Sequence, residues 1–181
     1  MEIQTDIPLL NEILDPWKAV IGNDFQGYKN HIIRMLNFCF YLADPTEEER
    51  RKLIIAAAHH DIGIWSGPEI TADYLPPSLI ESRKYLEKNG LSDWTEEIDL
   101  IIDQHHKIRQ FKSDKYRLVE LFRRADLVDF SLGLFKKGVP KSFVVQVRET
   151  IPNAGFHKLL LKLTWMQLEK NPFNPAPMMK W

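Results

Sequence analysis

Residues 46–63 read TEEERRKLIIAAAHHDIG, and this stretch decides the fold. Thr46 is followed three residues later by Glu49, the spacing of a capping box that satisfies free N–H groups at the start of a helix. The charged residues then give way to an apolar run, and Gly63 breaks the pattern. The spacing therefore predicts a helix from Thr46 to about Asp61, ending on two histidines and an aspartate.

The flanking segments also have helical rather than alternating periodicity. Helices are expected over about 24–42, 78–89, 92–108, 113–137, from 140 onward and over 154–170, whereas 62–77 is expected to be a loop with one helical turn. Residues 142–147 are the one β-like run, and the proline-rich segment 171–177 is not helical. The prediction is one all-α domain over 1–181, a bundle of about six to eight helices. Its motif-bearing core spans about 25–135, and the C-terminal helices and tail, 139–181, pack on that core.

Composition narrows the class of protein. The chain has 181 residues, of which 44% are hydrophobic, so a packed core is available and a disordered chain is excluded. Its 24 basic and 25 acidic residues give a net charge of −1, which argues against polymeric nucleic acid as a partner. Cys39 is the only cysteine, so neither an internal disulfide nor a cysteine metal site can form. No signal sequence or membrane span is visible, and a cytoplasmic location is expected.

Four residues from three expected helices can form a metal site. His60 and Asp61 are adjacent, and side chains one residue apart on a helix diverge by only about 100°, so both can lean toward one point. His31 on the preceding helix can face the same point. Asp126 lies on a later apolar helix, where an unpaired carboxylate would be costly. Two imidazoles and two carboxylates suit Mn, Fe, Co, Ni or Zn, and one divalent ion per chain is expected.

The order of these residues resembles the H…HD…D signature of the HD-domain superfamily of metal-dependent phosphohydrolases. The matching segments are HIIR at 31–34, AAAHHDIG at 56–63, IIDQHH at 101–106 and RADLVD at 124–129. The resemblance spans roughly 25–135. It implies an all-α fold and an enzyme that hydrolyses a phosphomonoester or phosphodiester of a small, nucleotide-like or other phosphorylated substrate through a metal-activated water.

The resemblance also suggests which residues carry the reaction. Asp61 is expected to hold the metal and to be essential for catalysis. His105 or His106, together with Arg34 or Lys107, is expected to stabilise developing negative charge. Other readings stay open, because the two histidines could lie on a solvated helix end. Arg34 could equally form a structural pair with a carboxylate.

Further positions have structural readings. His59 and Asp129 are expected to support the fold or the ligands, and His157 shows no partner in the sequence. Glu69 or Asp73 could act as a general base, and nothing in the spacing chooses between them. The aromatic residues Trp65, Tyr74 and Trp94 could stack a nucleobase or simply pack.

Two further functions remain open beside hydrolysis. A di-iron oxygenase on the same scaffold would need two more histidine ligands on separate segments, and no histidine lies between Asp61 and His105. His105 with an unidentified carboxylate could still hold a second metal. The other alternative is a non-catalytic binding or regulatory module that keeps the metal. Within the superfamily, the apolar residues 62–65 lack the acidic motif of alarmone hydrolases, and no Gly-Tyr-Pro follows His106, unlike cyclic-di-GMP phosphodiesterases.

Overall fold

The computed structural model describes residues 2–174 and 177, and within these residues the elements are all helices. Seven helices have ten or more residues: α3 (Phe25–Leu42), α4 (Glu47–His59), α5 (Leu75–Lys88), α6 (Thr95–Gln104), α7 (Arg117–Phe130), α8 (Lys141–Thr150) and α9 (Phe156–Lys170). Shorter elements are α1 (Pro8–Leu14), α2 (Lys18–Ile21) and the 3₁₀ turns Asp15–Trp17, Gly22–Asp24, Ile62–Ile64 and Ser92–Trp94. The predicted all-α class is confirmed.

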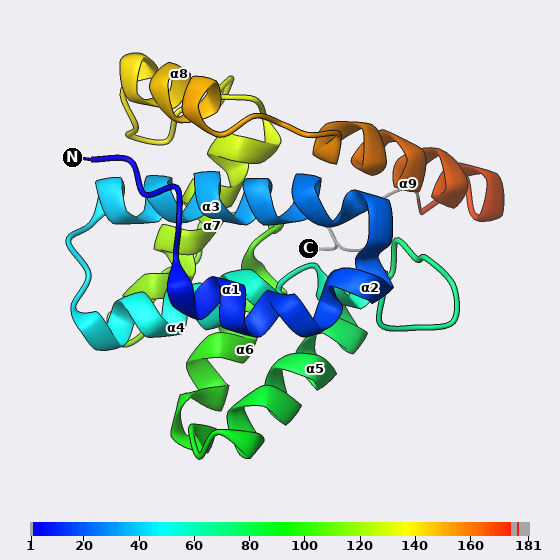
Figure 1. Cartoon of the computed structure of the whole chain (residues 1–181), viewed down its shortest axis with the longest axis horizontal. Helices are drawn as coiled ribbons and strands as arrows, with labels where there is room; N and C mark the ends of the chain where they lie inside the picture. The colour runs from blue at the N-terminus through cyan, green and yellow to red at the C-terminus, as the bar shows by residue number, and fades with distance from the viewer. Residues whose placement is uncertain (1, 175–176, 178–181) are drawn as a thin grey trace.

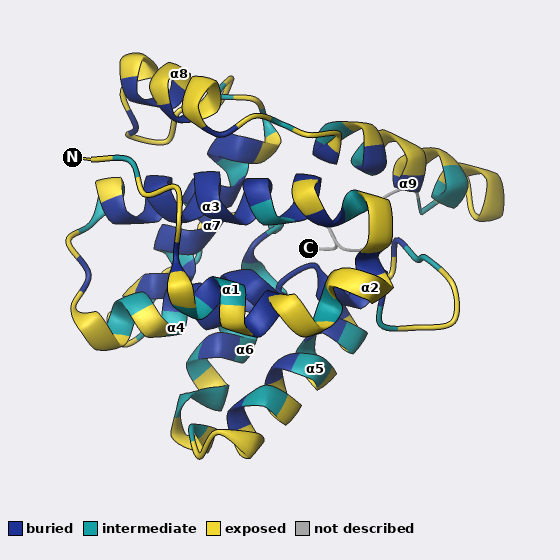
Figure 2. Cartoon of the chain, in the orientation of Figure 1, coloured by how far each residue is buried: buried dark blue, intermediate teal, exposed yellow. Residues whose placement is uncertain are grey.

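Helix α3 runs through the middle of the molecule and packs mainly against α7 (Figure 1). Of its 18 residues, 14 are buried, so it has almost no solvent-facing side (Figure 2). A helix buried nearly all round is normally apolar. Here His31, Arg34 and two asparagines are buried as well, so this central helix brings polar chemistry into the core.

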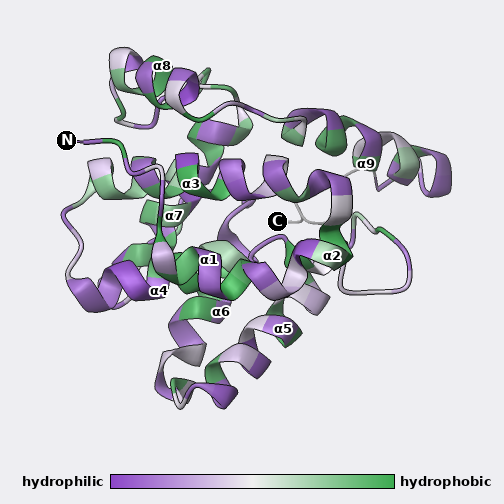
Figure 3. Ribbon diagram, viewed as in Figure 1, coloured by the Kyte–Doolittle hydropathy of each residue, from purple (hydrophilic) through white to green (hydrophobic). Residues whose placement is uncertain are grey.

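The other helices enclose α3 and α7. Helix α1 lies over α4, while α5 and α6 pair below them, and α8 and α9 lie on the opposite side of α3 (Figure 1). Apolar segments of α4, α6 and α7 gather toward the middle of the molecule (Figure 3). Among the described residues, no helix combines the length and apolar character needed to cross a bilayer.

The capping box at the start of α4 forms as predicted. The Glu49 backbone N–H donates to the Thr46 hydroxyl at 3.3 Å, and the Thr46 N–H donates to the Glu49 carboxylate at 2.9 Å. The helix then ends at His59, with His60 as its C-cap residue. Its apolar second half therefore delivers the His60–Asp61 pair to the centre of the molecule.

The helix expected over 78–89 begins earlier, and Ser78, which has the spacing of a capping box with Glu81, does not cap it. Helix α5 begins at Leu75, with prolines in its first turn, and the hydroxyl of Ser78 instead accepts a hydrogen bond of 2.9 Å from the Gly63 N–H. A Cβ on Gly63 would lie only 2.1 Å from the Tyr74 carbonyl oxygen. Only glycine permits this contact, which joins the turn after Asp61 to the start of α5.

Several predicted boundaries also differ from the structure. The helix expected over 92–108 ends at Gln104, and that expected over 113–137 spans only 117–130. Residues 131–138 instead form turns with positive φ at Leu132 and Lys137. The β-like run 142–147 lies inside α8, where Phe143, Val144 and Val147 form its buried face. Helical burial, and not alternation, explains that apolar pattern.

The C-terminal helices α8 and α9 both contact α3. At Gly27 the backbone of residues 154–156 approaches so closely that a Cβ would lie 2.8 Å from the Ala154 carbonyl oxygen. This approach lets the Phe156 ring stack on His31, with centroids 4.0 Å apart. Of the proline-rich tail, 171–174 is not helical, and 175–176 and 178–181 lie outside the described residues.

Candidate metal centre

Six side chains from four parts of the chain meet between α3 and α7. His31 comes from α3, Asp126 from α7, and the pairs 60–61 and 105–106 follow the C-terminal ends of α4 and α6. His31, His60, Asp61, His105 and Asp126 are each at most 2% exposed. Two groups of three could hold an ion, His31–His60–Asp61 and Asp61–His105–His106, and Asp61 belongs to both.

The ring nitrogens of His31 and His60 are arranged as metal ligands. The Nδ1 of His60 lies 2.7 Å from the Ala57 carbonyl oxygen, which can only accept, so Nδ1 carries the proton. The Nδ1 of His31 donates in the same way to Asp129 at 2.7 Å. Burial lowers the pKa of His31 to about 4, so its ring is neutral near pH 7. In the neutral tautomers that these Nδ1 contacts select, the Nε2 lone pairs of His31 and His60 face each other across 3.1 Å.

The same pattern recurs at His105. Its Nδ1 lies 2.6 Å from the Ile102 carbonyl oxygen, so its Nε2 is also a lone-pair donor. That Nε2 lies 3.4 Å from Oδ1 of Asp61, and neither atom has a hydrogen-bond partner within the described chain. Buried polar atoms are rarely left unpaired. These atoms therefore fit a divalent cation, which accepts lone pairs from imidazole and carboxylate alike.

Asp126 borders both groups. Its two carboxylate oxygens lie 3.5 Å from Nε2 of His31 and 3.5 Å from Nδ1 of His106. Burial raises the pKa of Asp126 to about 8, and the carboxylates of Asp61 and Asp129 act in the same direction. A nearby cation would favour the ionised form of this carboxyl group.

Asp129 lies one helical turn beyond Asp126 and is fully partnered. Its carboxylate accepts from Nε and Nη2 of Arg34 at 2.6 and 2.7 Å, and from Nδ1 of His31. Burial alone would raise the pKa of Asp129, but the hydrogen bonds from Arg34 and His31 hold it well below its usual value. The ion pair of Asp129 with Arg34 therefore fixes the ring orientation of His31, as carboxylates behind metal-binding histidines commonly do.

His106 connects the centre to the outside. The phenol of Tyr74 lies 2.6 Å from its Nε2, while its Nδ1 faces Asp126. Its side chain is 11% exposed, compared with 3% or less for the other five. Access to the centre therefore passes His106.

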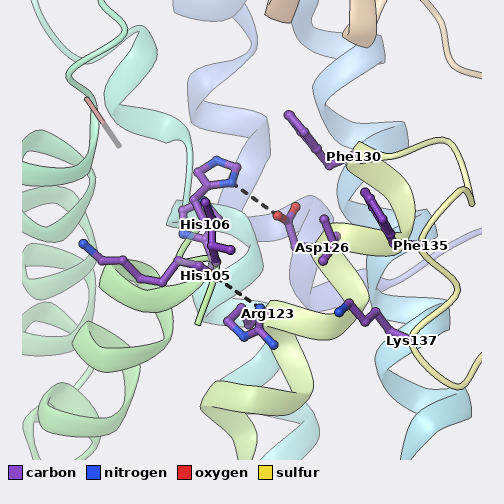
Figure 4. A pocket seen from close by; sticks show the side chains of 10 residues that line it. His105, His106, Arg123, Asp126, Phe130, Phe135 and Lys137 are labelled. Carbon is purple, nitrogen blue, oxygen red and sulfur yellow. Dashed lines mark hydrogen bonds and ion pairs between the residues drawn. The ribbon is translucent and has the colours of Figure 1, made fainter. Parts of the chain in front are cut away.

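A pocket of about 360 Å³ opens beside His106 (Figure 4). His106 and Asp126 point toward each other at its inner end, and Phe130 and Phe135 lie on the α7 side. The lining consists of His105, His106, Lys107, Ile108, Arg123, Asp126, Leu127, Phe130, Phe135 and Lys137. A small molecule in this pocket would contact the candidate centre directly.

The structure brings together most of the residues singled out from the sequence. His31, His60, Asp61, His105, His106 and Asp126 form one cluster, and His105 is buried, which contradicts a solvated helix end for that residue. His59 donates from Nδ1 to the Ile55 carbonyl oxygen at 2.8 Å and does not belong to either ligand group.

Arg34 requires a correction as a substrate-contacting residue. Of the two roles that the sequence left open, the structure shows the carboxylate pair with Asp129. The guanidinium also donates to the Pro152 carbonyl oxygen at 3.0 Å, and Arg34 does not line the pocket. Its buried position on α3, behind His31, separates it from any substrate.

Three other expectations also change. Glu69 and Asp73 are exposed, and Glu69 lies 3.9 Å from Lys170 on α9, so neither belongs to the cluster. His157 does have partners, because its Nε2 lies 3.1 Å from the Phe130 carbonyl oxygen and its Nδ1 contacts the Asn153 amide.

Sequence reasoning missed the role of Tyr74 and the pocket walls. Tyr74 lies at the end of an aperiodic loop, so no spacing connects it with His106. Phe135 and Lys137 lie in a segment that periodicity assigned to a continuing helix. Helix α7 ends at Phe130, just before Leu132 and Gly133, which both adopt positive φ, and Gly133 was the available signal in the sequence.

The comparisons with known proteins agree with this geometry. The family model of the HD domain matches residues 28–131, more than half of the chain. No curated protein and no solved structure matches the chain. The matched range contains both ligand groups and Asp126. The chain belongs to the HD domain family, a superfamily of metal-dependent hydrolases.

Proposed function

We propose that the protein is a metal-dependent phosphohydrolase that hydrolyses a phosphomonoester or phosphodiester of a small substrate at a single divalent ion. The observation that carries the proposal is the convergence of candidate ligand atoms. Nε2 of His31 lies 3.1 Å from Nε2 of His60 beside Asp61, and Nε2 of His105 lies 3.4 Å from Oδ1 of Asp61. The Nδ1 contacts of the three rings fix this orientation. Membership of the HD domain family supports the hydrolytic class.

His31, His60, Asp61 and Asp126 would hold the ion, which can be Mn, Fe, Co, Ni or Zn. When bound, such an ion polarises a phosphoryl oxygen and lowers the pKa of water. The chain's own contribution is orientation. The Ala57 carbonyl and Asp129 hold His60 and His31 in the tautomer that presents Nε2 to the centre.

His106 is the residue placed to move a proton. It lies between the pocket and the centre, with Tyr74 at Nε2 and Asp126 at Nδ1. Burial lowers its pKa, and the neighbouring His105 acts in the same direction. The neutral ring can accept a proton from one side and donate one to the other, as general acid–base catalysis requires.

One ion fits the cluster better than two. Both nitrogens of His106 face partners, Tyr74 on one side and Asp126 on the other, so His106 is not turned toward a second ion. Without it, the second group keeps only His105 and the shared Asp61. The net charge of −1 supports a small phosphorylated substrate rather than a polymeric nucleic acid.

A phosphoester screen with the full-length protein tests the proposal. The protein is reconstituted separately with Mn, Fe, Co, Ni and Zn and assayed against phosphomonoesters and phosphodiesters. Turnover is expected with at least one ion and is expected to disappear in Asp61→Ala. Glu96→Ala, which removes a surface carboxylate 69% exposed, is the matched control and should keep its activity. Turnover retained by Asp61→Ala, or none with any ion, contradicts the proposal.

A di-iron oxygenase is the second candidate, and one observation favours it. Asp61 belongs to both ligand groups, as a carboxylate shared between two ions would. Two irons per chain in the purified protein, together with oxygen consumption, would support this candidate over hydrolysis. Tight metal binding without either reaction would instead point to a non-catalytic binding module.

A further inference from the structure

We propose that the pocket beside His106 binds an apolar alkyl or aryl group, so that the substrate is the phosphoester of a hydrophobic alcohol. This inference rests on the proposed phosphohydrolase function for the phosphoryl end of the molecule. The pocket joins two different surfaces: His106 and Asp126 at the inner end, and Phe130 and Phe135 at the side (Figure 4). A bound molecule therefore needs a polar reacting end and an apolar body.

The walls of the pocket are apolar and exposed to water. Ile108 is 59% exposed, Phe135 53% and Phe130 38%, and Leu127 also belongs to the lining. Exposed apolar patches next to a polar centre are characteristic of ligand sites. An apolar group in the pocket would remove these side chains from water, with an affinity gain of roughly fourfold for each CH₂ group buried.

The polar side chains that line the pocket disfavour a nucleoside or a sugar as the organic group of the substrate. Apart from the two histidines and Asp126, the polar side chains in the lining are Lys107, Arg123 and Lys137. The described lining contains no amide or hydroxyl side chain that could pair with a base edge or a sugar hydroxyl. A nucleoside would thus leave its polar groups unpaired against phenylalanine, which costs affinity.

Arg123 does not change this conclusion, because each of its three guanidinium nitrogens already donates a hydrogen bond within the protein. Nε and Nη2 donate to the Glu120 carboxylate at 2.8 and 2.7 Å, and Nη1 donates to the Lys107 carbonyl oxygen at 3.1 Å. The ammonium of Lys137 forms no ion pair with a described residue. It gives the rim a positive charge that attracts an anionic ester without recognising its organic group.

The apolar wall is held in place before any ligand binds. Phe135 lies in the turn segment 131–138, where Leu132 and Lys137 adopt positive φ angles of 56° and 46°. Arginines fix both residues through their carbonyl oxygens: Arg148 donates to Leu132 at 2.6 Å, and Nε of Arg124 donates to Lys137 at 3.0 Å. A wall that is fixed in advance loses little conformational entropy on binding.

Binding of phosphonates to the full-length, metal-loaded protein tests the inference. Isothermal titration calorimetry compares methyl-, n-butyl-, benzyl- and 2,3-dihydroxypropylphosphonate with adenosine 5′-monophosphate. Benzylphosphonate is expected to bind at least about tenfold more tightly than methylphosphonate. The n-butyl compound should exceed the dihydroxypropyl compound, which has similar length but two hydroxyl groups.

Two variants in the turn segment 131–138 test whether Phe135 causes the preference for apolar groups. Phe135→Ala is expected to reduce the ratio of benzyl to methyl affinity severalfold. Leu134→Ala is the matched control, because Leu134 is 77% exposed and does not line the pocket, and its ratio should remain that of the wild type. An unchanged ratio in Phe135→Ala overturns the assignment of the wall. Phe135 is itself half exposed, so its replacement leaves the core intact.

Turnover of the matching methyl, butyl and benzyl phosphates separates the two proposals. A preference for apolar groups in binding, without turnover of any ester, overturns the hydrolase function and leaves the pocket assignment standing. Turnover without that preference, or tighter binding of the nucleotide than of benzylphosphonate, overturns the pocket assignment and leaves hydrolysis standing. If the protein neither turns over these esters nor prefers apolar groups in binding, both the hydrolase function and the pocket assignment are overturned.

Discussion

Asp126 and Asp129 lie one turn apart on α7, both almost completely buried, yet their surroundings are opposite. Asp129 accepts three hydrogen bonds from Arg34 and His31, which keep its pKa well below the usual value. Asp126 has no contact with a histidine nitrogen shorter than 3.5 Å, and burial raises its pKa to about 8. The protein supplies a counter-charge to the Asp129 carboxylate, whereas the Asp126 carboxyl group stays protonated near neutral pH unless a cation binds beside it.

The difference distinguishes two sets of residues: supporting residues, which we call the frame, and candidate metal ligands, which form the centre. Arg34 and Asp129 support His31 from behind and satisfy one another, so they belong to the fold. Asp126, Asp61 and His105 face inward with ligand atoms that the described chain does not fully satisfy. Because unpaired buried carboxylates are costly, we infer that a bound metal ion completes the interactions of these three residues.

The largest expected effect is the loss of turnover when a candidate metal ligand is replaced. Asp126→Ala removes one proposed ligand, so turnover should fall by at least about 10³-fold, equivalent to ~4 kcal/mol of transition-state stabilisation. The metal-free protein should remain folded, because the substitution removes a carboxylate that burial disfavours. Steady-state kinetics and thermal denaturation measure the two quantities. Full activity in this variant would contradict the assignment of Asp126 as a ligand.

Replacement of Asp129 should mainly reduce the free energy of unfolding. Asp129→Asn leaves the buried Arg34 without its counter-charge, at a cost of about 3 kcal/mol, the lower end for a broken buried pair because the amide oxygen still accepts one bond. Metal affinity should fall about 10–100-fold, because His31 loses its orienting partner. Urea denaturation and metal titration check these values. A normal unfolding free energy would show that the pair does not stabilise the fold.

The two carboxylates also predict opposite pH dependences in chelated protein. The folded-state pKa of Asp126, about 8, exceeds its ordinary value of 3.8, so its stabilising contribution is complete below pH ~4 and is lost as pH rises toward 8. The loss reaches up to ~1.4 kcal/mol per pH unit. For Asp129, with a lowered pKa, stability instead falls at acidic pH.

Denaturation of wild type and Asp126→Asn between pH 5.5 and 7.5, both in chelator, isolates the first of these slopes. The wild type should lose stability relative to the variant as pH rises. Added metal should abolish the difference between the slopes. Parallel profiles would mean that Asp126 is not protonated in the metal-free fold.

The smallest effect tests whether lost stability by itself impairs the centre. Thr46→Ala removes the cap at the far end of α4 and should cost ~1 kcal/mol of unfolding free energy. Metal affinity should stay at the wild-type value, because His60 lies at the other end of the helix. A parallel fall in affinity would remove the distinction between frame and centre.

The sequence was informative where local rules decide the structure. The capping box at Thr46, the helix over 25–42 and the all-α class follow from spacing and capping chemistry alone. The candidate ligands could also be predicted from the sequence, because histidines and aspartates that follow one another in this order on apolar helices have few structural explanations.

Features that depend on tertiary contacts were out of reach. Ser78 looks like an N-cap, but the proline-containing turn before it starts α5 three residues earlier, which leaves its hydroxyl for Gly63. Whether Arg34 faces a phosphate or Asp129 depends on how α3 crosses α7. The contact between Tyr74 and His106 joins the residue before α5 to a residue just after α6, and no sequence spacing connects the two.

Metal content of the purified full-length protein tests the central claim most directly. Inductively coupled plasma mass spectrometry after reconstitution with each of Mn, Fe, Co, Ni and Zn should find about one ion per chain for at least one metal. Asp61→Ala should bind none, whereas Glu96→Ala should match the wild type. Absence of bound metal from the wild-type protein under every reconstitution condition would contradict the account.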